Sequence, residues 1–152
     1  MEFCFEKTVA APVEKLFAFH EDPEHLRLLH QGWSSVRLLH SDGKVKVGGR
    51  IWVEIGIGGI LPVVLGFEFT HYDPPFSFAE RMIHGPFQLF THKHEFQAAA
   101  NGGILRDVLH IELPMQYGGE AVLRKLIAPA IVKAFQQRAD ALERLVHRGC
   151  LG

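Results

Sequence analysis

The hydrophobic pattern of the chain changes period, and this change limits the folds open to it. Between Trp33 and Met115, apolar residues recur at about every second position, whereas after Gly118-Gly119 they recur every third or fourth position as far as Leu145. Alternation is typical of strands with one buried face, and the wider spacing is typical of an amphipathic helix. Successive strands joined by short turns form an antiparallel meander, and the long helix must pack its apolar stripe on that sheet.

The turn residues divide this pattern into elements. Strands are predicted over residues 2–9, 33–40, 50–57, 61–72, 76–83, 87–98 and 104–115. Two short helices are expected after the first strand, over 13–20 and after Asp22-Pro23, where Asp22 can cap and Pro23 suits a first turn. An interior proline costs about 3 kcal/mol in a helix, so Pro129 predicts a kink, or a short helix before the main C-terminal one. Gly66 is a candidate bulge. The fold class is α+β.

Composition excludes several classes of protein. The 152 residues suit one domain spanning 1–152, and 47% apolar residues suffice for a core. A net charge of −1 with dispersed cations argues against nucleic-acid binding. No run of consecutive apolar residues approaches a length of 18, so we expect no membrane-spanning helix. The charged N-terminal stretch lacks the apolar core of a signal peptide, so a cytoplasmic location with free thiols at Cys4 and Cys150 is expected.

Residues 85–96 read GPFQLFTHKHEF and place two histidines inside a predicted strand. Alternate side chains of a strand share a face, so Phe90, His92, His94 and Phe96 should point together toward the interior. A connection centred on Ala100-Asn101 would pair residues whose numbers sum to about 201. His94 would then lie opposite Asp107, although a slip of two residues would separate the two.

Three interpretations of the His94–Asp107 pair remain open. The carboxylate can simply satisfy a buried imidazole, the pair can anchor the polar end of a ligand, or it can act as a general base. We expect no metal, because the strand supplies two histidines and zinc sites need three or four protein ligands. No cofactor fingerprint is present either.

Six strings, taken in order, resemble the SRPBCC superfamily, which includes START lipid-transfer domains and polyketide cyclase/dehydrase proteins. They are AAPVEKLFAFHEDPEHL (10–26), KVKVGGRIWVEI (44–55), THYDPPFSF (70–78), GPFQLFTHKHEF (85–96), LRDVLHIELP (105–114) and PAIVKAFQQRADALERL (129–145). The resemblance implies a helix-grip fold: a curved antiparallel sheet of about six to seven strands wrapped around the C-terminal helix, with an apolar cavity between them. Strand 76–83 could direct either Ser77, Ala79 and Arg81 or Phe78 and Glu80 inward, and the resemblance favours Phe78.

These considerations give a set of expected ligand-binding residues: Phe69, Phe78, Phe90, His92, His94, Phe96, Leu109, Ile111, Ile131, Phe135 and Arg138. Arg138 falls on the apolar stripe, so its guanidinium should reach water or a carboxylate, or else guard one end of the cavity. The apolar turn at residues 58–62 is either a hairpin tip or a lip over the cavity entrance.

The favoured function is binding of a small hydrophobic or aromatic molecule. One alternative is a cyclase/dehydrase-type enzyme that uses His94 and Asp107 as a general base pair, since the superfamily hosts carriers and enzymes. Another is a structural or partner-binding domain with a filled core. Edge strands could also pair two copies into a homodimer.

Overall fold

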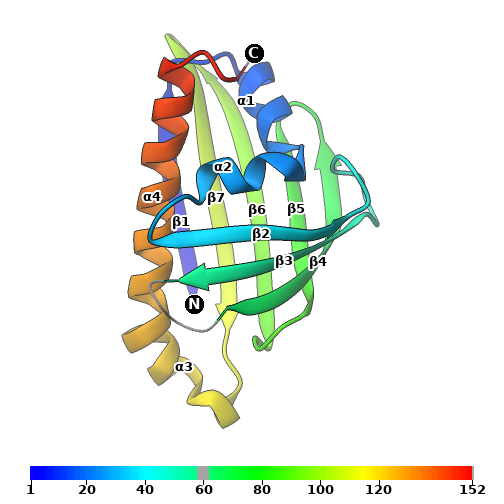
Figure 1. Cartoon of the computed structure of the whole chain (residues 1–152), viewed down its shortest axis with the longest axis vertical. Coiled ribbons are helices and arrows are strands. Elements are labelled where there is room, and N and C mark those ends of the chain that lie inside the picture. Colours follow the sequence, from blue (N-terminus) through cyan, green and yellow to red (C-terminus); the bar gives the residue numbers. More distant parts are fainter. Residues whose placement is uncertain (58–61, 152) are drawn as a thin grey trace.

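The computed structural model describes residues 1–57 and 62–151 as one antiparallel sheet with helices on its concave side (Figure 1). The turn at residues 58–62, which was expected to form a hairpin tip or a lip over the cavity entrance, lies outside the described residues except for Pro62. The seven strands are β1 (Glu2–Val9), β2 (Ser34–Ser41), β3 (Arg50–Ile57), β4 (Val63–Asp73), β5 (Ser77–His84), β6 (Leu89–Ala99) and β7 (Gly102–Glu112). Their order across the sheet is β1-β7-β6-β5-β4-β3-β2.

The helices form two groups. Between β1 and β2 lie α1 (Val13–His20), the 3₁₀ turn η1 (Pro23–His25) and α2 (Leu26–Leu29). The carboxylate of Asp22 accepts a hydrogen bond from the Glu24 backbone N–H at 3.1 Å, which confirms the predicted cap. After β7 come the 3₁₀ turn η2 (Met115–Tyr117), α3 (Gly119–Val122), the π turn η3 (Leu123–Ile127) and α4 (Ala128–His147).

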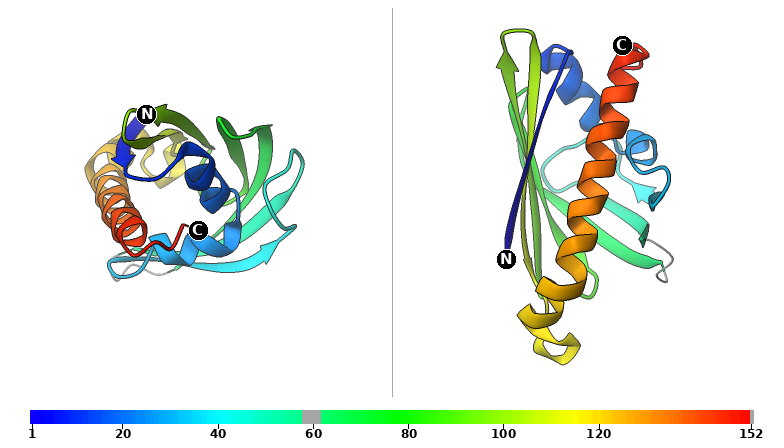
Figure 2. Two further views of the ribbon diagram at one scale, coloured as in Figure 1. Left: turned by 90° about the horizontal axis from the view of Figure 1, so that it is seen from above. Right: turned by 90° about the vertical axis from the view of Figure 1, so that its left-hand side faces the viewer.

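Pro129 lies in the first turn of α4, which continues directly from the π turn η3, where the Ala128 N–H donates to the Leu123 carbonyl. The expected interruption is confirmed: the wider π turn precedes the proline, with the short α3 before it and the main helix after it. Together these segments run along the open side of the curled sheet between the edge strands β1 and β2, while α1 and α2 cover one end (Figure 2). This is the α+β helix-grip fold that the resemblance implied.

The register of the central strands agrees with the expected hairpin. Ala99 pairs with Gly102 across the two-residue turn, which brings His94 opposite Asp107 and His92 opposite Leu109. On the other side of β6, Phe78 pairs with His94 and Glu80 with His92. The connection from His84 to Leu89 is longer than two residues, so β5 directs Phe78 and Glu80 inward, as the resemblance favoured for Phe78.

Gly66 in β4 leaves room for the side chain of Trp52 on β3. The pairing of β4 with β5 shifts between Gly66 and Phe67, which confirms the predicted bulge. A Cβ atom at Gly66 would lie 3.1 Å from the indole of Trp52 on β3, so a larger side chain would push that ring away. Among the described residues no helix is long and apolar enough to cross a membrane, and Cys4 and Cys150 are both free and exposed.

Candidate functional site

A cavity of about 590 Å³ lies between the concave face of the sheet, the α1–α2 region and α4. Its walls are mostly apolar and come from strands β2 to β7, from the α1–α2 region and from the long helix. Nine of the eleven expected ligand-binding residues border it: Phe69, Phe78, Phe90, His92, His94, Leu109, Ile131, Phe135 and Arg138. Clefts of about 300–1,000 Å³ with apolar walls and a few polar groups are typical of sites for small molecules.

Phe96 and Ile111, which were also expected to line the cavity, are buried without bordering it. The Phe96 ring packs edge-on against Phe17 of α1, with 5.1 Å between ring centroids. Ile111 is fully buried in a cluster with Leu109 and Leu123. Both point to the concave face, but neighbouring side chains separate them from the open space.

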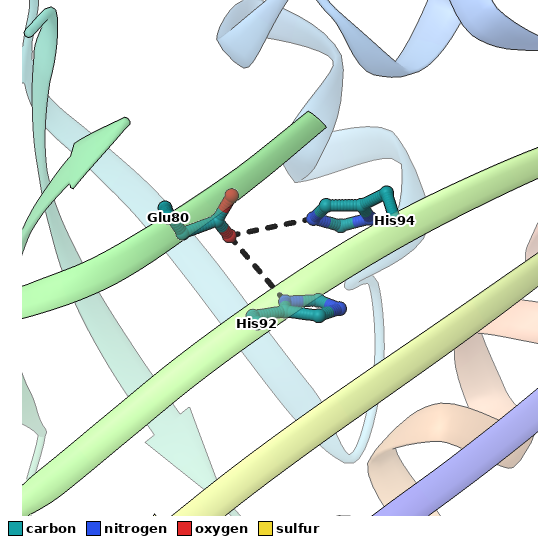
Figure 3. A group of neighbouring side chains, drawn as sticks. All are labelled: Glu80, His92 and His94. Carbon is teal, nitrogen blue, oxygen red and sulfur yellow. Dashed lines mark hydrogen bonds and ion pairs between the residues drawn. The ribbon is translucent and has the colours of Figure 1, made fainter. Parts of the chain in front are cut away.

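Two histidines and two carboxylates meet on the sheet side of the cavity. We call Glu80, His92, His94 and Asp107 the histidine–carboxylate cluster; all four side chains are buried. Glu80 comes from β5, the histidines from β6 and Asp107 from β7. The three strands are neighbours, and each residue faces inward because of the register given above. Figure 3 shows both imidazoles turned toward the Glu80 carboxylate.

The distances within the cluster are of two kinds. The Oδ1 atom of Asp107 accepts a hydrogen bond from His92 Nε2 at 2.8 Å and lies 2.9 Å from His94 Nδ1. The Oε1 atom of Glu80 lies 3.4 Å from His92 Nδ1 and 3.4 Å from His94 Nε2. Each ring nitrogen therefore lies within 3.4 Å of a carboxylate oxygen, and the two rings lie 3.8 Å apart. His94 Nδ1, although close to Asp107, has no hydrogen-bond partner among the described residues. The expected His94–Asp107 contact is present, with His92 and Glu80 added to it.

Burial and charge act in opposite directions on these groups. Burial alone would lower the pKa of His94, but the Glu80 charge and contacts with Asp107 outweigh it and raise the pKa to about 9. Burial would raise the pKa of Glu80, but the two histidines bring it down to about 2. For Asp107, Arg138 and the histidines overcome burial and hold the pKa well below its usual range.

Arg138 of α4 is a cationic side chain at the cavity wall, and its charge acts on the Asp107 carboxylate. The residue is only 8% exposed and borders the cavity. Its guanidinium lies over the Phe135 ring, 4.8 Å from the centroid, and Nη2 has no hydrogen-bond partner among the described residues. Arg138 therefore contributes a buried donor without a partner to the region that borders the cavity.

His20 and His30 also border the cavity, although neither was expected in the site. Their helical spacing with apolar neighbours was the available signal, and it indicates only burial. The Nδ1 atom of His20 donates to the Leu16 carbonyl at 2.7 Å, which leaves Nε2 as a buried acceptor without a partner in the described structure. Burial, reinforced by the nearby Arg138 charge, lowers the pKa of each histidine to about 3.

Residues 9–140 match the sequence profile of the family described as "Polyketide cyclase / dehydrase and lipid transport". The chain belongs to this family. The match covers most of the chain and confirms the SRPBCC superfamily that the sequence strings resembled. No curated protein matches the sequence.

Solved structures share the fold of this polyketide cyclase/dehydrase and lipid transport family member. Protein Ms6760 from Mycobacterium smegmatis has a TM-score of 0.76 at 15% identity, over 97% of this chain and 92% of that one. TTHA0849 from Thermus thermophilus has a TM-score of 0.74 at 20% identity, over 98% and 99%. Protein CV1439 from Chromobacterium violaceum has a TM-score of 0.70 at 15% identity, over 92% and 96%. At these identities the likeness concerns the fold alone.

Proposed function

We propose that the protein binds a small hydrophobic or aromatic molecule in the cavity between the sheet and α4. The observation that carries the proposal is the cavity itself, a space of about 590 Å³ with mostly apolar walls. Protein interiors are close-packed and rarely leave voids larger than a water molecule, so an opening of this size is typical of a binding site. A filled core would instead have supported a purely structural role.

The polar groups at the wall suggest how a ligand is oriented. Arg138 offers a donor without a partner, and His20 offers an acceptor without one, among the described residues. Leaving buried polar groups unpaired costs about 1–3 kcal/mol each, and a ligand that pairs with them recovers that energy. We therefore expect a molecule with an apolar or aromatic body and one oxygen-bearing end that reaches Arg138.

The cyclase/dehydrase alternative requires His94 to accept a proton from a substrate. A general base must present a free lone pair within hydrogen-bond reach of that proton. Instead, Nε2 of His94 pairs with Glu80 at 3.4 Å, and Nδ1 is buried 2.9 Å from Asp107. This geometry supports binding over base catalysis. Turnover of an aromatic carbonyl substrate by the wild type, and its loss in His94→Ala, would reverse that preference.

A cavity-filling variant tests the binding proposal. Ala134 of α4 borders the cavity, so Ala134→Phe places a ring in the open space, whereas Gln136→Phe adds the same ring at an exposed position of the same helix. Titration with the neutral fluorescent probe N-phenyl-1-naphthylamine should give saturable binding to the wild type and to Gln136→Phe. We expect at least about tenfold weaker binding to Ala134→Phe, because the ring occupies the ligand's volume.

Circular dichroism and thermal unfolding establish that each variant is folded. Should Ala134→Phe not fold, Val53→Phe fills the cavity from the sheet side and replaces it. Absence of probe binding to the folded wild type, or equal binding to the wild type and the cavity-filling variant, contradicts the proposal.

A further inference from the structure

We propose that Glu80, His92 and His94 form a site for a divalent first-row transition-metal ion, best matched to Zn²⁺, and that Asp107 orients both histidines from behind. One ligand atom from each of the three residues can be chosen so that all three atoms lie within 4.8 Å of one another. The residues are 9%, 6% and 5% exposed, respectively. Imidazole nitrogen and carboxylate oxygen are ligands that zinc takes in proteins.

The contacts of Glu80 with the two histidines match the geometry of a bound ion better than that of hydrogen bonds. Ligands at about 2.0–2.2 Å from a tetrahedral ion lie about 3.4 Å from one another. Glu80 Oε1 lies 3.4 Å from His92 Nδ1 and 3.4 Å from His94 Nε2. Hydrogen bonds between N–H and O are typically about 2.7–3.2 Å long, so these two contacts are long for direct pairs.

Asp107 occupies the position that a supporting carboxylate takes in metal sites. A histidine that binds a metal through one ring nitrogen usually donates the other N–H to a carboxylate or carbonyl, which fixes the ring's tautomer and orientation. Here the nitrogens directed away from Glu80 are His92 Nε2 and His94 Nδ1. They lie 2.8 Å and 2.9 Å from the same Asp107 oxygen.

Hydrogen bonds alone leave part of the cluster unpaired. Two are formed, one from His92 Nε2 to Asp107 at 2.8 Å and one between His94 Nε2 and Glu80 at 3.4 Å. Among the described residues, Glu80 Oε2 and His94 Nδ1 are buried without a hydrogen-bond partner. A metal ion held by Glu80, His92 Nδ1 and His94 Nε2 would let both rings stay neutral, with His92 Nε2 still donating to Asp107.

The remaining features indicate an accessible site. Glu80 Oε2 is buried and has no hydrogen-bond partner among the described residues, so it is free to complete the coordination of an ion. All three ligand residues border the cavity. Three protein ligands leave a fourth tetrahedral position for water or for an oxygen atom of a bound molecule. The inference does not depend on the proposed function, because the ion's ligands are protein side chains.

Metal titration of the untagged protein tests this site. After treatment with a chelator, the wild type should bind one Zn²⁺ per chain in competition with a zinc-sensitive dye, and Co²⁺ should compete for the same site whereas Mg²⁺ should not. Glu80→Gln and His94→Gln should each weaken binding by more than about 100-fold, and Asp107→Asn by about 10–100-fold.

The chain has ten histidines, so matched controls are needed. Glu54→Gln and His40→Gln change the same residue types at positions outside the cluster and should leave the affinity unchanged. X-ray absorption of the zinc-loaded wild type should show two imidazole nitrogens and oxygen at about 2.0–2.2 Å, and it decides the question even if a variant fails to fold.

Equal affinity of the wild type, Glu80→Gln and His94→Gln overturns the proposal, as does a zinc shell without two imidazoles. The proposal is also wrong if the wild type binds zinc no more tightly than the Glu80→Gln variant does at its remaining sites. Zinc binding is measured without an organic ligand. A negative zinc result therefore leaves the result of the probe titration unaffected, and a negative probe titration leaves the zinc result unaffected.

Discussion

Acidification should destabilise the protein through His20, and the variant His20→Asn isolates this effect. The pKa of the ring falls from 6.5 to about 3 in the folded protein, first because it is buried and further because Arg138 lies nearby. Asp107 raises this pKa, and His94 lowers it further. Below pH 6.5 the unfolded chain therefore binds a proton that the folded chain does not. The stabilisation from the neutral ring is complete above pH 6.5 and is lost progressively as the pH falls toward 3.

The size of the effect follows from the shift. Each pH unit between the two pKa values is worth about 1.4 kcal/mol. At about pH 5, which is roughly 1.5 units below the unfolded value, His20 should cost the wild type about 2 kcal/mol of its free energy of unfolding. Asparagine can still donate to the Leu16 carbonyl but does not titrate, so the variant should escape that loss.

Urea unfolding at pH 7.5, 6 and 5 measures the difference in pH dependence directly. Between pH 7.5 and 5, the wild type should lose about 2 kcal/mol more stability than His20→Asn. A control variant at an exposed histidine, His84→Asn, should keep the wild-type dependence. A constant offset between the wild type and His20→Asn at all three values would refute the reasoning, because it would mean that His20 titrates alike in the folded and unfolded chains.

Three further predictions concern stability. Phe78→Ala removes a fully buried ring beside the cluster and should cost about 3–5 kcal/mol in urea unfolding; a loss below about 1 kcal/mol would show that the position is not tightly packed. Asp107→Ala removes the acceptor of His92 and the negative charge beside His94, and should cost about 3–5 kcal/mol. Glu95→Ala, at a partly exposed neighbour in the sheet, should cost less than about 1 kcal/mol; equal losses would contradict a buried charge network. Gly102→Ala should lower the melting temperature, because its Cβ would collide with the Val9 carbonyl; an unchanged melting temperature would show that β1 can move aside.

The β6–β7 register could be predicted from the sequence because it depends on local information. A two-residue turn at Ala100-Asn101 and the alternation of side chains on either side determine which residues face each other. The inward position of Glu80 depended on the loop before β6, whose length the turn residues left ambiguous. The third member of the candidate metal site therefore became evident only when β5 was paired with β6.

The extent of the cavity could not be predicted in the same way. Strand alternation shows which side chains face the interior, and it says nothing about which of them meet another element there. Phe96 faces inward but meets Phe17 of α1, while Phe90 on the same strand borders open space. The burial of Arg138 likewise depends on how α4 crosses the curled sheet, a tertiary arrangement that the spacing of apolar residues within one helix does not determine.

The central claim is that the sheet and α4 enclose an open apolar space, and a crystal structure determined under xenon pressure tests it most directly. Apolar cavities bind xenon without any specific recognition, so the result does not depend on knowing the ligand. We predict xenon density within the cavity beside Phe69, Leu109 and Ile131, and its loss in Ala134→Phe. Side chains that fill this space in the wild type, with no xenon between the sheet and the helix, would contradict the account.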